Sequence, residues 1–172
     1  ANLQSDNMSV LLGAGDSLFL PQSTFMTGTA PGFVAVHDFN QDGVQDVVTA
    51  NRTSNGPGDV SLLTGKGDGT FQTPLSFVAG VKPAAIAIGD FDSDGRSDMA
   101  VANNGSNSVS LLLAASAFEV TATLAAGDSP RAILTLDFNQ DGHLDLAVAN
   151  LNSFNVEVLL GNGQGGFGSP VA

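Results

Sequence analysis

Oxygen-bearing side chains recur at one spacing in three nine-residue segments, residues 38–46, 90–98 and 137–145, which we call loop one, loop two and loop three. In each loop, Asp or Asn stands at positions one, three, five and nine, and Gly stands at position six. A calcium ion takes about six to eight hard oxygen ligands, and a chain can supply them by curling around the ion. The spacing therefore predicts three Ca²⁺ sites. The expected side-chain ligands are Asp38, Asn40, Asp42 and Asp46 in loop one, Asp90, Asp92, Asp94 and Asp98 in loop two, and Asp137, Asn139, Asp141 and Asp145 in loop three.

The residue at position seven of each loop is expected to contribute its backbone carbonyl. These residues are Val44, Arg96 and His143. Because only the main chain would take part, the side chain is free to vary from apolar to cationic to imidazole. The preceding glycine is expected where the curl is tightest, since a residue without Cβ adopts positive φ at little steric cost.

The first half of this pattern also occurs in EF-hands, whose loops close with a bidentate Glu at position twelve between two helices. Position twelve here is Thr49, Val101 or Val148, none of which can chelate through its side chain. The segments around loop one, 33–36 and 46–49, are short and rich in β-formers, so they predict strands. Solvated Asp/Asn/Gly turns without metal are the alternative; they explain one such loop well and three copies poorly.

Two further motifs recur in step with the loops. A Gly-x-x-Pro turn begins ten residues before the first Asp of each loop, and an Ala-Asn pair ends thirteen residues after it. The glycines are Gly28, Gly80 and Gly127, and the asparagines are Asn51, Asn103 and Asn150. A period of 52 and then 47 residues with about four short strands each is typical of β-propeller blades. We expect an all-β fold of about three and a half four-stranded antiparallel blades, divided as 1–27 (an outer half-blade), 28–79, 80–126 and 127–172.

The first residues of the chain repeat a later segment. Residues 1–13 align without a gap on residues 149–161, so the chain is expected to start halfway through a blade. A closed ring of six or seven blades needs roughly twice this length. We therefore expect either a part of a longer propeller or copies that complete each other's ring. Two copies would supply enough strands for seven blades, but both would contribute the same outer half-blade.

These motifs resemble the FG-GAP repeats, also called VCBS-type repeats, of bacterial surface proteins and integrin α-subunits. The resemblance covers essentially the whole chain and rests on Phe167-Gly168, on residues 127–130 and on the Asp-x-[Asp/Asn]-x-Asp-Gly-x-x-Asp loops. It implies a propeller whose calcium loops lie on one face. Members of the family include adhesion receptors, lectins and non-catalytic appendages of enzymes, so the resemblance does not choose among these functions. The length departs from the family, whose members generally have enough repeats to close a ring.

Charge and composition exclude some classes of protein. The net charge of −12 would repel the phosphates of nucleic acids. No segment approaches the roughly 20 apolar residues of a membrane span. Weak calcium sites would be empty in a cytosol, and the chain has no cysteine, so we expect an extracellular, secreted or cell-surface location.

No set of residues in the sequence predicts catalysis. Residues 15–18 spell a Gly-Asp-Ser-Leu hydrolase motif, but they occupy a hairpin position of the repeat. His37 and His143 are the only histidines and stand at different positions of their repeats. We therefore expect a non-catalytic, calcium-binding interaction or adhesion module whose partner is another protein, another copy or further blades. The alternative is a lectin: exposed Asn and Ser could bind sugar hydroxyls, although no Trp or Tyr is present to stack on a sugar ring.

Overall fold

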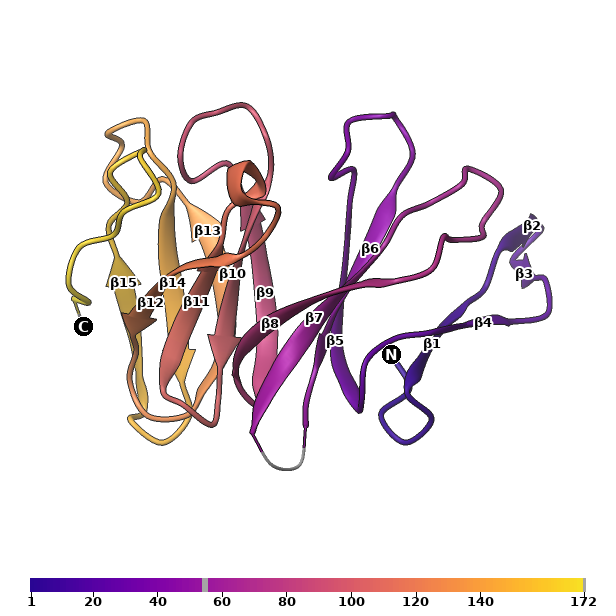
Figure 1. Ribbon diagram of the computed structural model, residues 1–172, viewed down its shortest axis with the longest axis horizontal. Coiled ribbons are helices and arrows are strands. Elements are labelled where there is room, and N and C mark those ends of the chain that lie inside the picture. Colours follow the sequence, from indigo (N-terminus) through magenta and orange to yellow (C-terminus); the bar gives the residue numbers. More distant parts are fainter. Residues whose placement is uncertain (54–55, 172) are drawn as a thin grey trace.

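The computed structural model describes residues 1–53 and 56–171; Ser54, Asn55 and Ala172, which fall within the predicted repeats 28–79 and 127–172, lie outside the described residues. The described chain is built of antiparallel sheets that stand side by side in an open arc (Figure 1). The predicted all-β fold of propeller blades is confirmed. The sheets do not close into a ring.

Two sheets have four strands in sequence order, as a propeller blade requires. The first sheet contains β5 (Pro31–His37), β6 (Asp46–Asn51), β7 (Pro57–Leu63) and β8 (Leu75–Val81). The second contains β9 (Pro83–Gly89), β10 (Asp98–Asn103), β11 (Ser108–Leu112) and β12 (Val120–Ala125). A 3₁₀ turn, η1 (Ala114–Ser116), follows β11.

The sheets at the two ends of the arc are smaller. At the C-terminal end, β13 (Pro130–Leu136), β14 (Asp145–Asn150) and β15 (Asn155–Leu159) form a three-stranded sheet. On the other edge of β15, a single bridge joins Val158 to Val171, the pair equivalent to Leu62 and Leu75 at the start of β8. At the N-terminal end, β1 (Asn7–Val10) pairs with β4 (Ser23–Met26), and between them β2 (Gly13–Gly15) and β3 (Leu18–Phe19) form a small hairpin.

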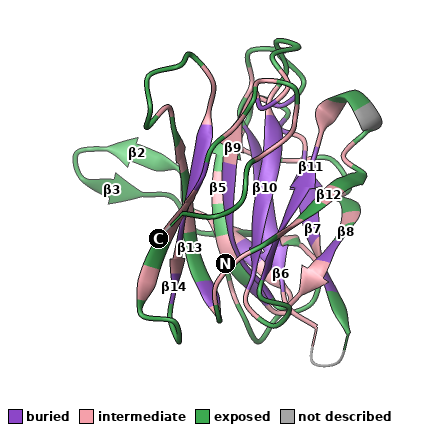
Figure 2. Cartoon of the chain, turned by 90° about the vertical axis from the view of Figure 1, so that its left-hand side faces the viewer, coloured by how far each residue is buried: buried purple, intermediate pink, exposed green. Residues whose placement is uncertain are grey.

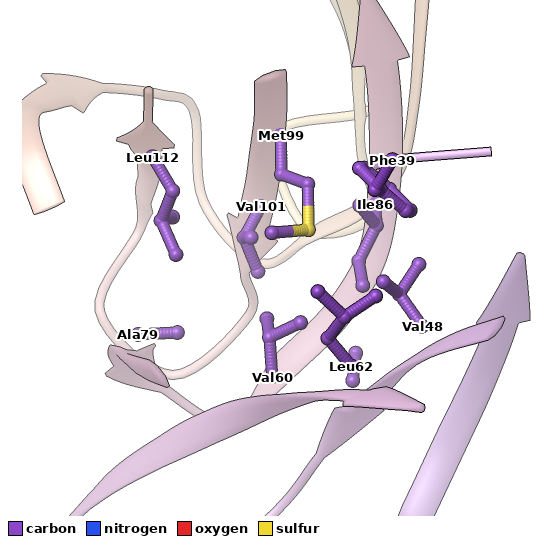
Figure 3. Packing of buried hydrophobic residues seen from close by; sticks show 10 residues of the cluster. Phe39, Val48, Val60, Leu62, Ala79, Ile86, Met99, Val101 and Leu112 are labelled. Carbon is purple, nitrogen blue, oxygen red and sulfur yellow. The ribbon is translucent and has the colours of Figure 1, made fainter. Parts of the chain in front are cut away.

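Apolar side chains fill the space between neighbouring sheets. Val48 and Leu62 of the β5–β8 sheet meet Ile86 and Met99 of the β9–β12 sheet, and all four are buried (Figure 3). The second strands, β6 and β10, are buried along their whole length (Figure 2). Such strands are covered on both faces, which explains their continuous runs of small apolar residues.

The Gly-x-x-Pro turn and the Ala-Asn pair of each repeat meet in space. Asn103, at the end of β10, is fully buried; its Oδ1 accepts a hydrogen bond from the Gly80 N–H (3.0 Å), and its Nδ2 donates one to Ser110 Oγ (2.9 Å). A Cβ on Gly80 would lie 2.5 Å from the Asn103 side chain. The same crowding occurs between Gly28 and Asn51 and between Gly127 and Asn150. The two motifs recur together because the glycine leaves room for the asparagine.

Candidate metal centre

The three predicted loops join the first two strands of the three larger sheets, and all lie at the same edge of the arc (Figure 1). The glycine at position six has positive φ in each loop, as predicted: 84° at Gly43, 85° at Gly95 and 89° at Gly142. Position four is also left-handed, with φ of about 60° at Gln41, Ser93 and Gln140. The sequence pattern did not reveal this second strained position, because non-glycine residues occupy it.

The first Asp of each loop accepts two hydrogen bonds from the backbone that curls around it. In loop two, Asp90 Oδ1 accepts from the Asp94 N–H (3.1 Å), and Asp90 Oδ2 accepts from the Gly95 N–H (2.9 Å). Asp38 and Asp137 accept the equivalent pairs of bonds in the other two loops. The curl expected from the spacing is therefore present in all three loops.

Loop two brings three carboxylates together. Asp90, Asp92 and Asp98 each offer an oxygen, and these oxygens all lie within 4.8 Å of one another. Burial and the nearby Asp94 carboxylate raise the pKa of Asp92, and burial raises the pKa of Asp98. A cation among the three would relieve the repulsion that disfavours their charged forms. This hard oxygen set, drawn from positions one, three and nine, suits Ca²⁺.

The Asp at position five is held by a neighbouring side chain instead. In loop two, Asp94 lies outside the group of three and forms a salt bridge with Arg96 (2.6 Å), which lowers the pKa of Asp94. In loops one and three, where Asn occupies position three, its Nδ2 donates to Oδ2 of Asp42 (2.9 Å) or Asp141 (2.8 Å). Oδ2 of the position-five carboxylate is thus engaged by a neighbouring side chain in all three loops.

The Asp at position nine is fully buried in each loop and accepts two backbone hydrogen bonds. Asp98 Oδ2 accepts from the Phe91 N–H inside the loop (2.9 Å), and Asp98 Oδ1 accepts from the Ala114 N–H just beyond β11 (2.8 Å). Asp46 and Asp145 make the same pair of bonds in their own sheets. The spacing predicted a closing ligand here, and the link to the third strand was missed. The sequence signal for this burial is that each position-nine Asp is the first residue of an apolar strand.

The side chains at position seven meet the glycine hairpins of their own sheets. Val44 and His143 are half-buried, and a Cβ on Gly67 or Gly163 would contact them. His143 Nδ1 is buried without a hydrogen-bond partner among the described residues. In the β9–β12 sheet, the segment at the hairpin position has no glycines. There Arg96 is exposed and binds Asp94 instead. The side chain at position seven was expected to be free to vary in type, but in loops one and three its contact with the hairpin limits that choice.

Neighbouring loops also touch. Gln41 Nε2 of loop one donates to the Gly95 carbonyl of loop two (2.6 Å), and the imidazole of His37 lies 2.6 Å from Ser97 Oγ. Farther along the arc, the Gly165 N–H donates to the Phe91 carbonyl of loop two (2.9 Å). Loops one and two are therefore in direct contact, and loop two also contacts the glycine hairpin that follows β15.

Comparison with protein families identifies the repeats. An FG-GAP-like repeat model matches residues 38–101 and 90–148, and an FG-GAP repeat model matches residues 129–169. These matches span most of the 172 residues, and the chain belongs to the FG-GAP repeat family. A comparison with curated proteins gave no significant match. Among the described residues, no helix has the length and apolar character to pass through a lipid bilayer.

Proposed function

We propose that this chain is a non-catalytic, calcium-binding interaction or adhesion module of the extracellular space. Membership of the FG-GAP family supports a propeller-type module. The observation that carries the calcium assignment is the convergence of the Asp90, Asp92 and Asp98 oxygens within 4.8 Å, in a loop whose backbone curl recurs twice more.

Electrostatics gives calcium a structural role in this proposal. Ten of the 17 acidic residues lie in the loops, three in loop one, four in loop two and three in loop three. Three Ca²⁺ ions would change the net charge from −12 to −6. The bound ions would hold the acidic loops in one conformation and let neighbouring sheets keep their loops in contact, since opposite charge favours ionised carboxylates.

The expected stabilisation is a large part of a typical folding free energy. A site whose ligand is present at about ten times its dissociation constant contributes roughly 1.4 kcal/mol. Three such sites would contribute roughly 4 kcal/mol of the about 5–15 kcal/mol by which domains are stable. Extracellular calcium modules have dissociation constants of roughly 0.1–1 mM, so this stabilisation would be present outside cells and lost inside them.

Thermal unfolding in calcium and in chelator tests the proposal. We expect millimolar calcium to raise the midpoint by roughly 8–16 °C relative to EDTA, because about 1 kcal/mol shifts a domain of this size by about 2–4 °C. Magnesium at the same concentration is the control and should have little effect, since it is smaller and demands near-octahedral geometry. Equal midpoints in calcium and EDTA would contradict the proposal.

A further inference from the structure

The N-terminal end of the arc exposes a face that is buried inside it. Val34 of β5 and Ile86 of β9 occupy the same repeat position, 52 residues apart. Ile86 points into the β5–β8 sheet and is 4% exposed, whereas Val34 is 44% exposed. Val36, on the same side of β5, is 56% exposed. This side of the first strand is the one that packs on a preceding blade.

The C-terminal end of the arc exposes the opposite face. Leu134 of β13 matches Ala87 of β9 and is 54% exposed, against 6% for Ala87. Phe138 of loop three is 42% exposed, whereas the equivalent Phe39 and Phe91 are buried. Here the chain exposes the side that receives a following blade. The two ends of the arc thus carry the two halves of one blade-to-blade interface.

The β1/β4 pair is the outer half of a blade in its packing as well as in its sequence. Met8 and Phe25 pack on Val47 and Leu63. This is the arrangement in which the repeat-equivalent Val60 and Phe77 pack near Met99 and Leu112 inside the arc. Within the described residues, β4 pairs along one edge of β1, and the other edge carries only a single bridge between Asn2 and Asn7.

A groove lies where the inner strands of that half-blade would be. It has a volume of about 450 Å³ and is lined largely by apolar side chains, among them Met8, Val10, Val34, Val36 and Phe71. An inner strand pair placed in it would pair with the free edge of β1 and cover Val34 and Val36. Inside the arc, the inner pair β5–β6 covers Ile86 in this way.

We propose that the occupant of this groove is the β13–β14 strand pair of a second copy of this chain, with β1 taking the place of that copy's β15. Residues 1–13 match residues 149–161 at nine of 13 positions without a gap, so β1 presents nearly the same edge to β14 that β15 presents. The exchange joins the two complementary end faces and continues the blade-to-blade interface already present twice within the arc. β4 follows β1 as the outer strand, so the shared blade is β13–β14–β1–β4, and β15 leaves its pairing with β14.

Strand exchange also sets the number of blades in a particle made of two copies of these 172 residues. Each copy contributes the β5–β8 and β9–β12 sheets and one blade shared between copies, which makes three blades per chain. Two copies then form six blades, within the range of about four to eight found in closed propellers. The outer half-blade that both copies carry gives no surplus of strands in this arrangement, because β1 of one copy replaces β15 of the other. This inference deepens the proposed interaction function by naming the partner, and it does not depend on calcium binding.

Complementary variants test the head-to-tail geometry. Val36→Arg places a charge on one face and Leu134→Arg on the other, and neither residue is an expected calcium ligand. By light scattering we expect wild-type particles of about 35 kDa, twice the 17.3 kDa chain, and 17.3 kDa for each variant alone. The mixture of the two variants should recover particles of about 35 kDa, because one intact interface remains between them. That recovery also shows that both variants are folded.

Three results would overturn the head-to-tail proposal: a 17.3 kDa wild type at every concentration, a single variant that still associates, or a mixture that does not recover. Calcium binding measured on the same samples separates this failure from failure of the proposed function. Chains that bind calcium but stay monomeric would refute only the association.

Disulfide crosslinking tests the strand exchange itself, and the absence of native cysteines makes the result clean. Val10 aligns on Val158, which pairs with Ala147 of β14. β1 and β14 lie at opposite ends of the arc, so Val10→Cys and Ala147→Cys can meet only between copies (Figure 1). A mixture of the two single variants should give a crosslinked pair on a non-reducing gel, and each variant alone should not. Association without this crosslink would overturn the exchange.

Discussion

The buried aspartate that ends each loop ties the loop to the exit of the third strand. Asp98 is fully buried and satisfies two backbone N–H groups, one in loop two and one just beyond β11. Asp92 accepts a single long bond from the Asp94 N–H (3.3 Å) and is half-buried. Both are expected calcium ligands, but only the first has a structural task that does not need the ion.

We therefore predict different effects for two variants of loop two. Asp98→Asn places an amide N–H against a buried backbone donor and should lower the free energy of unfolding by roughly 1–3 kcal/mol even in EDTA. Asp92→Asn should lower it only in calcium, and in EDTA should be neutral or slightly stabilising, because burial and Asp94 already disfavour the charged carboxylate. Urea unfolding with and without calcium measures both. Equal losses in EDTA would contradict the assignment.

In the calcium-bound state that we propose, Arg96 would compete with the ion for Asp94. Because its guanidinium binds Asp94 Oδ2 at 2.6 Å, Arg96→Gln should free that carboxylate and strengthen calcium binding to loop two by roughly two- to fivefold, the range of an exposed ion pair. Isothermal titration calorimetry of the variant and the wild type measures the change. Unchanged or weaker binding would mean that Asp94 is not a ligand.

The sequence predicted much of the site at this scale. Positions of Asp, Asn and Gly were enough to locate the three loops and their positive-φ glycines. The Asp94–Arg96 pair and the backbone bonds of Asp98 could not be predicted, because they depend on side-chain direction and on where the third strand ends.

At the scale of elements, the Gly-x-x-Pro turn and the buried asparagine act as one unit. Gly80→Ala should destabilise the protein by roughly 1–3 kcal/mol, because the added Cβ would displace Asn103 from its bonds with the Gly80 N–H and Ser110. Gly13→Ala is the matched control and should be nearly neutral, since nothing lies within 4 Å of its Cβ. Thermal unfolding compares them. Equal effects of the two changes would show that the turn and the asparagine are not coupled.

The local sequence predicted where strands lie better than it predicted the residues at which they begin and end. The segments 33–36 and 46–49 were predicted as strands, and the structure extends them to β5 (Pro31–His37) and β6 (Asp46–Asn51). The strands are longer than predicted because they pair with neighbouring strands, and the β-propensity of a segment does not include that pairing. The short strands β2 and β3 form the hairpin predicted at residues 15–18, although the bounds of the two strands were not predicted.

At the scale of the whole molecule, an open arc carries a row of acidic loops along one edge and complementary apolar faces at its two ends. The half-blade arrangement was foreseen from the match of residues 1–13 with residues 149–161. An open arc was expected to leave an apolar sheet face uncovered at each end, but the residues on those faces, such as Val34 and Leu134, were not identified, because strand residues inside the arc and at its ends have the same pattern.

The central claim is that each of the three loops binds one calcium ion. Equilibrium dialysis of the intact chain in millimolar calcium, followed by elemental analysis, tests it most directly. We predict three calcium ions per 17.3 kDa chain. Two or fewer ions per chain at saturating calcium would contradict the claim.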